Sequence, residues 1–522
     1  MTTTSDAIEL SSIDARTGVV VETMPATPPD AIAAGAVAAG VLFRASRRHE
    51  SDAPLRLLAA LADELDADAA GLIEVADRET ALGPARLRGE LARTAFQLRA
   101  FTAPEVLHHV PQTLTDAADP NRVPPRSSQS RRNVPVGPVA VFAASNFPFA
   151  FGVVGGDTAS ALAAGCPVVV KAHPAQPSTG ARIARAIDRA ITSTGVDPAW
   201  LQVVSGSSPA SGAQLVGHPA ISAVGFTGST AGGTALVDAA ARRPRPIPVF
   251  AEMGSVNPSY VAPHAAASRT VEIATSWAAS LSGNAGQFCT KPGLLLVPEE
   301  HAAAVSAAAT EALGITDVPP MVHPNLARGY ERMLDRAMTT QGVTGNLHPP
   351  AEQAGNRVAA AVLAVSAATL FAHPELADEI FGPAGVVVAC AEGDHERLAE
   401  ILPGALASSI IADPEDTDWV RRMLPVIETG VGRIVFNAWP TGVSIGWATV
   451  HGGPWPATSA PATTSVGYTA ALRWLRPVAY EHFPEELLPA AVTRSSPRSA
   501  TPENLYAGSV VAKSWVSQIA QS

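Results

Sequence analysis

The chain has 522 residues, enough for two or three domains, and it is 47% hydrophobic and 16% charged, as expected of a folded enzyme rather than a disordered protein. Its formal net charge of −11 argues against nucleic acid as the main partner, because phosphate backbones are held by clustered lysine and arginine. Its three cysteines, Cys166, Cys289 and Cys390, lie far apart. The sequence therefore predicts no disulfide framework and, without clustered histidine and cysteine, no metal site.

The acidic N-terminus has neither the basic start nor the apolar block of a signal peptide. Two alanine-rich runs, 31–43 and 358–372, are shorter than the roughly 20 residues that a bilayer span requires. We expect both runs to form core helices, and the protein to be cytoplasmic with no membrane span.

Residues 50–105 have helical periodicity, and from residue 137 to 254 strand-like and helix-like segments alternate. This alternation is typical of a parallel, doubly wound sheet, whose ligands bind at the carboxyl ends of the strands. A second alternating region runs to about Pro440. The strands predicted in the first region are 137–144, 167–173, 201–206, 223–229 and 246–254, and the helices are 152–165, 178–195, 211–219 and 230–243.

Two other segments have a distinct composition. Residues 118–136 are polar and proline-marked, which predicts a connector or an extended arm. Residues 437–464 are rich in glycine, proline and tryptophan, which predicts a long ordered loop. The dinucleotide fingerprint G-x-G-x-x-G is absent, although Gly228 and Ser229, at a strand-to-helix turn, could present N–H groups to a phosphate. An ordinary tight turn is the alternative.

Six motifs occur in the order seen in the aldehyde dehydrogenase superfamily, which the chain resembles from its helical N-terminal part to roughly Pro489. Three details, Phe288, EMGSVNP and FNAWPTGVSI before VHGGPWPATS, resemble the α-ketoglutaric semialdehyde (2,5-dioxopentanoate) dehydrogenases and the related NADP-linked fatty aldehyde dehydrogenases. The six motifs are ASNFPFAFG (144–152), VVVKAHPA (168–175), FTGSTAGG (226–233), FAEMGSVNP (250–258), GQFCTKPG (286–293) and DEIFGP (378–383).

The resemblance implies an α/β fold with two doubly wound parallel-sheet domains and a small β oligomerisation arm. It also implies a homodimer or homotetramer. The C-terminal tail is expected to be either a flexible appendage or a docking segment, since Val511, Trp515 and Ile519 have helical spacing. The implied units are a dinucleotide-binding domain (1–125 and 137–250), a catalytic domain (251–464), the arm (126–136 and 465–490) and the tail (491–522).

The resemblance assigns three catalytic roles. Cys289 matches the nucleophile, which attacks the aldehyde carbon, and Gly283 and Gly286 are expected to let the backbone approach the substrate. Glu252 matches the general base for thioester hydrolysis, and we expect burial to raise its pKa. Asn146 matches the oxyanion donor. Judged without the motifs, these residues would be an inert thiol, a solvated carboxylate and an Asx turn.

Cofactor residues are implied in the same way. Lys171 matches the lysine that binds ribose hydroxyls, Glu379 and Phe381 match the pair that positions the nicotinamide ribose and ring, and Gly228 and Ser229 fit the pyrophosphate turn. Pro174 stands where many NAD-preferring members carry a glutamate. Without that carboxylate, Lys171 and His173 could attract a 2′-phosphate, so the sequence predicts use of NAD or NADP, with NADP favoured.

The sequence leaves two questions open. Lys291 could lower the thiol pKa, meet a substrate carboxylate or turn to solvent. Trp439, Trp447 and Trp455 could shape the substrate pocket or pack on the surface. Whether the pocket ends in a cation, as suits a semialdehyde acid, or stays apolar, as suits a long-chain aldehyde, is undecided.

The leading interpretation is NAD(P)-dependent oxidation of a small-molecule aldehyde to a carboxylic acid through a cysteine thiohemiacetal and thioester. The substrate favoured is 2,5-dioxopentanoate, and a fatty or aromatic aldehyde is the alternative. Transfer of the acyl group to CoA is disfavoured because Glu252 is present to activate water. From another class, the chain could be a catalytically silent binding or structural relative.

Overall fold

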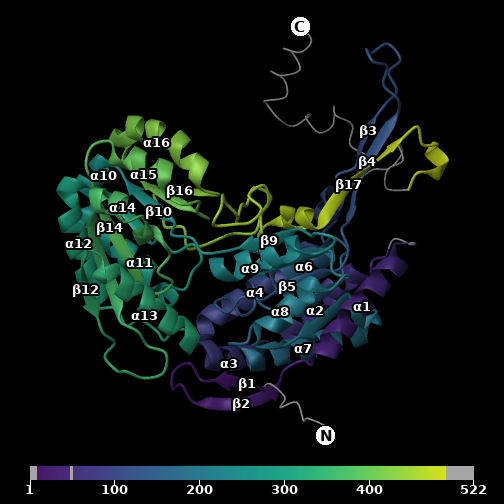
Figure 1. Cartoon of the computed structure of the whole chain (residues 1–522), viewed down its shortest axis with the longest axis horizontal. Coiled ribbons are helices and arrows are strands. Elements are labelled where there is room, and N and C mark those ends of the chain that lie inside the picture. Colours follow the sequence, from purple (N-terminus) through teal and green to yellow (C-terminus); the bar gives the residue numbers. More distant parts are fainter. Residues whose placement is uncertain (1–8, 48–50, 490–522) are drawn as a thin grey trace.

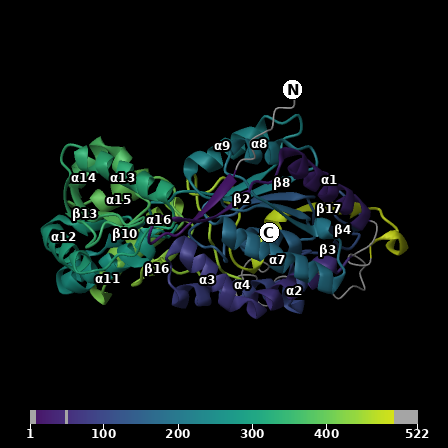
Figure 2. The same ribbon diagram turned by 90° about the horizontal axis from the view of Figure 1, so that it is seen from below.

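The structure, a computed structural model, describes residues 9–47 and 51–489. Two lobes, each built around a mainly parallel sheet, lie side by side, and a narrow antiparallel sheet extends from one of them (Figure 1). The same two lobes are seen from below in Figure 2. The C-terminal helix predicted around Val511–Ile519, and the rest of the tail, fall outside the described residues.

The first lobe contains a five-stranded parallel sheet with the order β7-β6-β5-β8-β9. The chain begins at the central strand and builds outward in both directions, so the predicted doubly wound arrangement is confirmed. The strands are β5 (Val139–Phe142), β6 (Val168–Lys171), β7 (Leu201–Val204), β8 (Ala223–Thr227) and β9 (Val249–Glu252), and the connecting helices are α6 (Gly156–Ala163), α7 (Pro177–Thr194), α8 (Pro209–Gly217) and α9 (Thr230–Ala241).

Helices cover both faces of this sheet. Val168 and Val170 pack on one side against α7 and the predicted N-terminal helices, which are α2 (Ala53–Ala67), α3 (Ala69–Thr80) and α4 (Pro84–Ala100). Val169 packs on the other side against α1 (Pro29–Ser46), α8 and α9. Because successive strand residues face opposite sides, a continuous apolar run such as VVV is what a sheet buried on both faces requires.

The second lobe contains a seven-stranded sheet with the order β12-β13-β14-β11-β10-β15-β16, in which only β12 is antiparallel to its neighbour. The strands are β10 (Pro258–Val261), β11 (Leu294–Pro298), β12 (Thr344–His348), β13 (Ala360–Ser366), β14 (Ala384–Cys390), β15 (Ser408–Ile411) and β16 (Ile434–Phe436). The helices are α10 (Pro263–Ser268), α11 (Thr270–Ser282), α12 (Glu299–Gly314), α13 (Pro324–Thr339), α14 (Ala367–Ala372), α15 (Asp394–Ile401) and α16 (Thr417–Gly430).

One of the two predicted core helices is wrong. Residues 31–43 do lie in α1, but 358–372 form strand β13 followed by the short helix α14. Val362 and Leu363 are buried between neighbouring strands of the sheet. Tertiary packing on both faces has overridden the helix propensity of the alanines.

The polar segment before the five-stranded sheet contributes to the narrow antiparallel sheet, which has three strands and projects from the first lobe (Figure 1). Here β4 (Gln129–Pro135) pairs antiparallel with β3 (Leu114–Asp116) and β17 (Leu475–Glu481). Residues 437–464 contain no regular helix or strand and pass along the junction of the two lobes, as predicted for an ordered loop. The domain boundaries themselves stay a prediction. Of the helices within the described residues, none has the length and apolar character to cross a bilayer.

Candidate active site

The candidate site lies where the chain passes from one lobe to the other. Strand β9 ends at Glu252, and β10 starts at Pro258, so five residues link the two sheets. The ordered loop returns to this link, because the Met253 N–H donates to the carbonyl of Ala457 (2.8 Å) and Glu252 forms a β-bridge with Thr458. Cys289 lies in the loop between α11 and β11.

The cysteine loop is fixed by a buried asparagine that the sequence argument did not select. Asn257 Nδ2 donates to the carbonyls of Cys289 and Lys291, both at 2.9 Å. Asn257 is fully buried and its φ is +50°, a left-handed conformation that asparagine tolerates better than most residues. The residue therefore joins the inter-lobe link to the loop that carries the thiol.

Gly286 has a different role from the one predicted. Its φ is +67°, and a Cβ there would collide with the carbonyl of Gly382. Glycine is required because this loop packs against the backbone of the segment around Phe381. The expectation that Gly286 allows approach to the substrate is not what the packing shows.

Asn146 lies against the cysteine loop, since its Nδ2 donates to the carbonyl of Gln287 (2.9 Å). Helix α4 holds the segment that carries it. Arg86 Nη2 donates to the Asn146 carbonyl (3.0 Å), and Glu90 Oε1 accepts from the N–H groups of Phe149 (2.8 Å) and Ala150 (2.9 Å).

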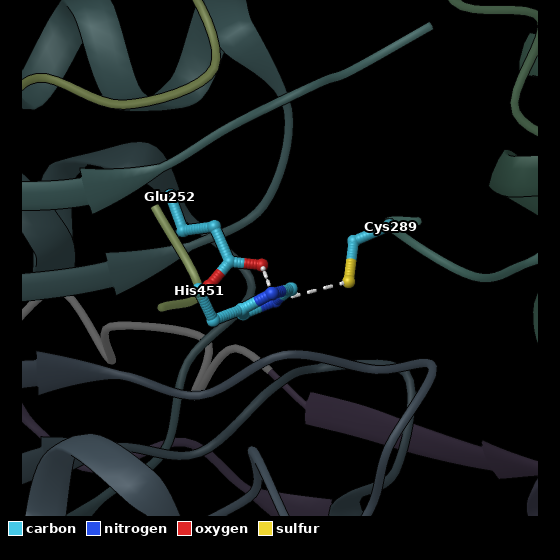
Figure 3. A group of neighbouring side chains, drawn as sticks. All are labelled: Glu252, Cys289 and His451. Atoms are coloured by element: carbon cyan, nitrogen blue, oxygen red, sulfur yellow. Dashed lines mark hydrogen bonds and ion pairs between the residues drawn. The ribbon is translucent and has the colours of Figure 1, made fainter. Parts of the chain in front are cut away.

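Glu252 and Cys289 meet through a third residue, His451 (Figure 3). His451 Nε2 lies 3.4 Å from Cys289 Sγ and 2.8 Å from Glu252 Oε1, and Ser465 Oγ donates to Glu252 Oε2 (2.7 Å). His451 and Glu252 are 1% and 4% exposed, whereas Cys289 is half-buried. The prediction missed His451, which is one histidine inside a Gly/Pro/Trp-rich loop; its position in VHGGPWPATS was the only available signal.

The predicted direction of the Glu252 pKa shift is wrong. Burial acts to raise the pKa of Glu252, but the adjacent His451 ring and the hydrogen bonds from Ser465 and Cys289 outweigh it, so the pKa is lowered. Burial, reinforced by the charge of Glu252, raises the pKa of the Cys289 thiol well above its usual range. The resting site therefore holds a carboxylate and a protonated thiol.

The other two cysteines are core residues. Cys166 and Cys390 are buried, and burial raises the pKa of Cys166 to about 12 and that of Cys390 still further. Cys289 is the cysteine that combines partial exposure with a neighbouring base. The expectation of no metal stays a prediction, because the ligand atoms of Glu252, Cys289 and His451 lie within 4.8 Å of one another.

The predicted cofactor residues of the first lobe lie near the carboxyl edge of its sheet. Lys171, at the end of β6, donates from Nζ to the Gly206 carbonyl (2.6 Å), and Ser229 caps the start of α9 by accepting from the Gly232 N–H (3.2 Å). Gly228 is less available to a phosphate than expected, because its N–H donates to the carbonyl of Glu252 (3.0 Å).

His173 cannot act as the predicted cation. Burial, and then the positive charge of Lys171, lower the pKa of His173 to about 3, so the ring is neutral at neutral pH. Its Nδ1 accepts from the Ala175 N–H (3.1 Å), which leaves Nε2 as a hydrogen-bond donor. Pro174 is half-buried in the turn after β6.

Lys291 is buried, 1% exposed, which excludes the solvent-facing alternative. Its Nζ donates to three backbone carbonyls, those of Ile380 (2.6 Å), Gly382 (3.0 Å) and Ala384 (2.6 Å). All three ammonium protons are thus used, so the side chain is not available to a substrate carboxylate. It instead fixes the backbone on both sides of Phe381.

Glu379 reaches from the second lobe to the inter-lobe link. A Cβ on Gly254 would lie 2.7 Å from Glu379 Oε2 and 3.0 Å from Thr230 Oγ1 at the start of α9. Burial raises the pKa of Glu379 to about 8, with the charge of Lys291 opposing the rise. Glu379 Oε1 is buried and has no hydrogen-bond partner among the described residues.

These residues fit a nicotinamide dinucleotide. The unpaired Glu379 Oε1 is an acceptor of the kind that a ribose hydroxyl satisfies, and the first turn of α9 offers N–H groups of the kind that bind phosphate. Lys171 adds a cation at the same edge of the first sheet. Phe381 is half-buried beside this acceptor in sequence.

Comparison with known proteins agrees with this geometry. The family model "Aldehyde dehydrogenase family" matches residues 2–453. The chain is 44% identical to "Alpha-ketoglutaric semialdehyde dehydrogenase 2" of Azospirillum brasilense over 458 residues, 87% of each chain. It is 41% identical to the "Alpha-ketoglutaric semialdehyde dehydrogenase" of Acinetobacter baylyi over 441 residues, 82% of each chain.

Solved structures of aldehyde dehydrogenases have the same fold. A crystal structure of succinic semialdehyde dehydrogenase from Streptococcus pyogenes, in complex with NADP+, superposes with a TM-score of 0.76 at 15% identity, covering 91% of this chain and 100% of that one. The chain belongs to the aldehyde dehydrogenase family and is an NAD(P)-dependent oxidoreductase of aldehydes, as its motifs indicated.

Replacing His451 by alanine removes the strongest influence that lowers the pKa of Glu252. In His451→Ala we expect that pKa to rise, so that the acid limb of the kcat/KM–pH profile moves to higher pH. We also expect kcat at neutral pH to fall, because a smaller fraction of Glu252 is then ionised. Ser465→Ala, which removes one hydrogen bond, should shift the limb less in the same direction. An acid limb that stays in place or moves down in His451→Ala would contradict this assignment.

Lys291→Met leaves three buried carbonyls without their donor, at roughly 1–3 kcal/mol for each unsatisfied group. We expect a lower melting temperature and a higher KM for the cofactor. The pH at which iodoacetamide alkylates Cys289 should not change. A shift of that alkylation profile would show that Lys291 acts on the thiol after all.

Proposed function

We propose that Cys289 is the nucleophile, Glu252 the general base and Asn146 an oxyanion donor in the oxidation of an aldehyde to a carboxylic acid. The observation that carries this proposal is the contact of a single imidazole nitrogen with both the Cys289 sulfur and an ionised, buried Glu252. A silent relative has no need for a buried carboxylate and a thiol in this arrangement, whereas acyl transfer through cysteine requires a base beside the sulfur.

In the first step the Cys289 thiol gives its proton to the Glu252 carboxylate, to which it is hydrogen-bonded. His451 Nε2 donates to the same carboxylate and so has no lone pair to accept that proton. The Cys289 sulfur then bonds to the aldehyde carbon, and the oxyanion of the thiohemiacetal receives hydrogen bonds from Asn146 Nδ2 and the Cys289 N–H. For this, Asn146 must exchange its present bond to Gln287 for one to the substrate. When bound, the nicotinamide ring supplies the acceptor for the hydride that leaves the substrate carbon.

Glu252 acts again in the second half of the reaction, after the proton from the thiol has passed to solvent. The thioester on Cys289 is hydrolysed by a water whose proton is taken by the carboxylate, which is ionised because its pKa is lowered. The water oxygen becomes part of the acid product, and the sulfur leaves as a thiolate that regains a proton. Overall, aldehyde, water and oxidised cofactor give acid, reduced cofactor and a proton.

The substrate we propose is 2,5-dioxopentanoate, oxidised to 2-oxoglutarate. The support comes from the two relatives named as α-ketoglutaric semialdehyde dehydrogenases, which match this chain at 44% and 41% identity over most of their length. A fatty or aromatic aldehyde is the alternative substrate.

We propose that the cofactor is held by Lys171, the start of α9 with Ser229, Glu379 and Phe381, and that NADP is preferred. Pro174 places no negative charge in the turn after β6, where a carboxylate would repel a 2′-phosphate. His173 contributes a neutral hydrogen-bond donor, so Lys171 is the cation that favours the phosphate.

The domain division and the assembly are also proposals. We assign nucleotide binding to the lobe with the five-stranded sheet, catalysis to the lobe with the seven-stranded sheet, and oligomerisation to the arm. The projecting sheet of β3, β4 and β17 supports a homodimer or homotetramer, because its free edges can pair with a second chain. Three free cysteines support a reducing, cytoplasmic location.

Glu252→Gln separates the two halves of the reaction, because the thiol ionises more easily once the Glu252 charge is gone, whereas hydrolysis still lacks its base. With NADP and 2,5-dioxopentanoate, this variant should release one equivalent of reduced cofactor in a burst and then turn over roughly 10²–10⁴ times more slowly than the wild type. Cys289→Ala should show no burst. Full steady-state turnover in either variant would contradict the proposed roles.

Pro174→Glu tests the cofactor proposal. A carboxylate in the turn after β6 should lower kcat/KM for NADP by about tenfold or more through like-charge repulsion, while kcat/KM for NAD stays the same or rises. Ser178→Glu, at the half-exposed start of α7, is a control for added charge. A wild type that prefers NAD by a hundredfold would refute the proposed preference.

A further inference from the structure

Aromatic side chains line one side of the reactive sulfur. Phe147, Phe151 and Phe288 are here called the aromatic wall. Phe147 contacts the other two, with ring centroids 5.3 Å from Phe151 and 5.8 Å from Phe288. Phe288 precedes Cys289, and Phe151 lies 6.1 Å from the ring of His451. The aromatic wall therefore borders the reaction centre.

Two arginines of helix α4 lie over the aromatic wall. Arg86 and Arg93 are seven residues apart and so share a face of the helix. The Arg86 guanidinium lies 4.8 Å from the Phe147 centroid and 5.8 Å from that of Phe288, and Arg93 lies 5.8 Å from the centroid of Phe151. A third arginine, Arg433, directly precedes β16 and interacts electrostatically with Cys289.

Arg86 and Arg433 are already engaged. Arg86 Nη2 donates to the Asn146 carbonyl and lies 3.5 Å from Glu90 Oε2. Arg433 Nη1 and Nη2 donate to the carbonyls of Gly442 and Pro440, both at 2.5 Å. Both terminal nitrogens of Arg433 thus hold the ordered loop.

Arg93 is the least engaged of the three, although Arg86 Nη1 is likewise buried without a partner among the described residues. The one hydrogen bond of Arg93 among the described residues is long, from Nη2 to the Val443 carbonyl at 3.4 Å, and its Nη1 is buried with no partner there. The charge of Glu90 acts on Arg93, but Glu90 Oε1 accepts from the Phe149 and Ala150 N–H groups and Oε2 lies 3.5 Å from Arg86 Nη2. A buried donor without an acceptor is costly, and a guanidinium satisfies it best by binding a carboxylate through two parallel bonds.

The charge of Arg93 also acts on the reactive sulfur, since Cys289 and Arg93 interact electrostatically. A ligand that bonds to Cys289 at one end can therefore place a negative group at Arg93 with the other end. A neutral aldehyde would fill the same space against the aromatic wall but leave Nη1 unpaired.

We infer that Arg93 binds the carboxylate of an ω-aldehyde acid and thereby selects semialdehyde acids over neutral aldehydes of the same length. This inference rests on the proposed function, and it answers the question of whether the pocket ends in a cation. Arg93 is a specificity residue and takes no part in proton or hydride transfer.

The test compares kcat/KM for 2,5-dioxopentanoate, 5-oxopentanoate and pentanal in the wild type, Arg93→Met and Arg93→Lys. In Arg93→Met we expect kcat/KM for the two acids to fall on the order of 30-fold, mainly through KM, and kcat/KM for pentanal to stay within about twofold of the wild type. Arg93→Lys keeps the charge and should recover part of the loss. Arg88→Met, at an exposed position of the same helix, is the matched control and should change none of the three values.

The outcomes separate the inference from the proposed function. An equal loss for pentanal and the acids in Arg93→Met would show a structural role and overturn the inference. A wild-type preference for the acids that survives in Arg93→Met would overturn the inference alone. A wild type that shows no preference for the acids over pentanal would contradict the proposed substrate and, with it, the anion site.

Discussion

An ionised carboxylate held almost out of contact with water, at the link between the two sheets, is the constraint on which this site depends. Glu252 is 4% exposed, and it stays charged because His451 and Ser465 each contact one of its oxygens. Burial of the neighbouring thiol, reinforced by the negative charge of Glu252, keeps that thiol protonated. At rest the base is therefore deprotonated and the nucleophile protonated, so the thiol must lose its proton before the sulfur can attack.

The surrounding residues hold the catalytic groups of the two lobes in fixed positions relative to one another. Asn257 ties the cysteine loop to the link between the sheets, and Gly286 lets that loop pack on the segment around Phe381. Lys291 fixes the same segment by donating hydrogen bonds to three of its carbonyls. The catalytic and cofactor-facing loops are thus joined by buried polar contacts, which are directional and leave little freedom for relative movement.

Much of the fold was predictable from the sequence. The five-stranded sheet was read from short β-rich runs between amphipathic helices, because that periodicity reflects local packing. The core helix predicted for residues 358–372 is wrong, because an alanine-rich run is compatible with burial in a sheet as well as in a helix bundle. Cys289, Glu252 and Asn146 came from motifs that the family shares, and the structure brings all three to one junction.

Contacts between segments that are distant in the chain could not be predicted from the sequence. His451 lies 162 residues from Cys289, and only the return of the ordered loop brings the two together. The same reason explains the wrong pKa direction for Glu252, since burial was foreseeable but the imidazole beside it was not. Lys291 looked like a functional charge because its neighbours in sequence are catalytic, whereas its partners lie about 90 residues away in the 380–384 segment.

The most direct test of the central claim is the ultraviolet absorbance of the thiolate, taken as the difference between the wild type and Cys289→Ser across a pH titration without cofactor. The account predicts that the thiolate signal appears only in the alkaline range, and that it appears at lower pH when Glu252 is replaced by glutamine. A thiolate already present at neutral pH in the wild type, or a titration that ignores the loss of the Glu252 charge, would contradict it.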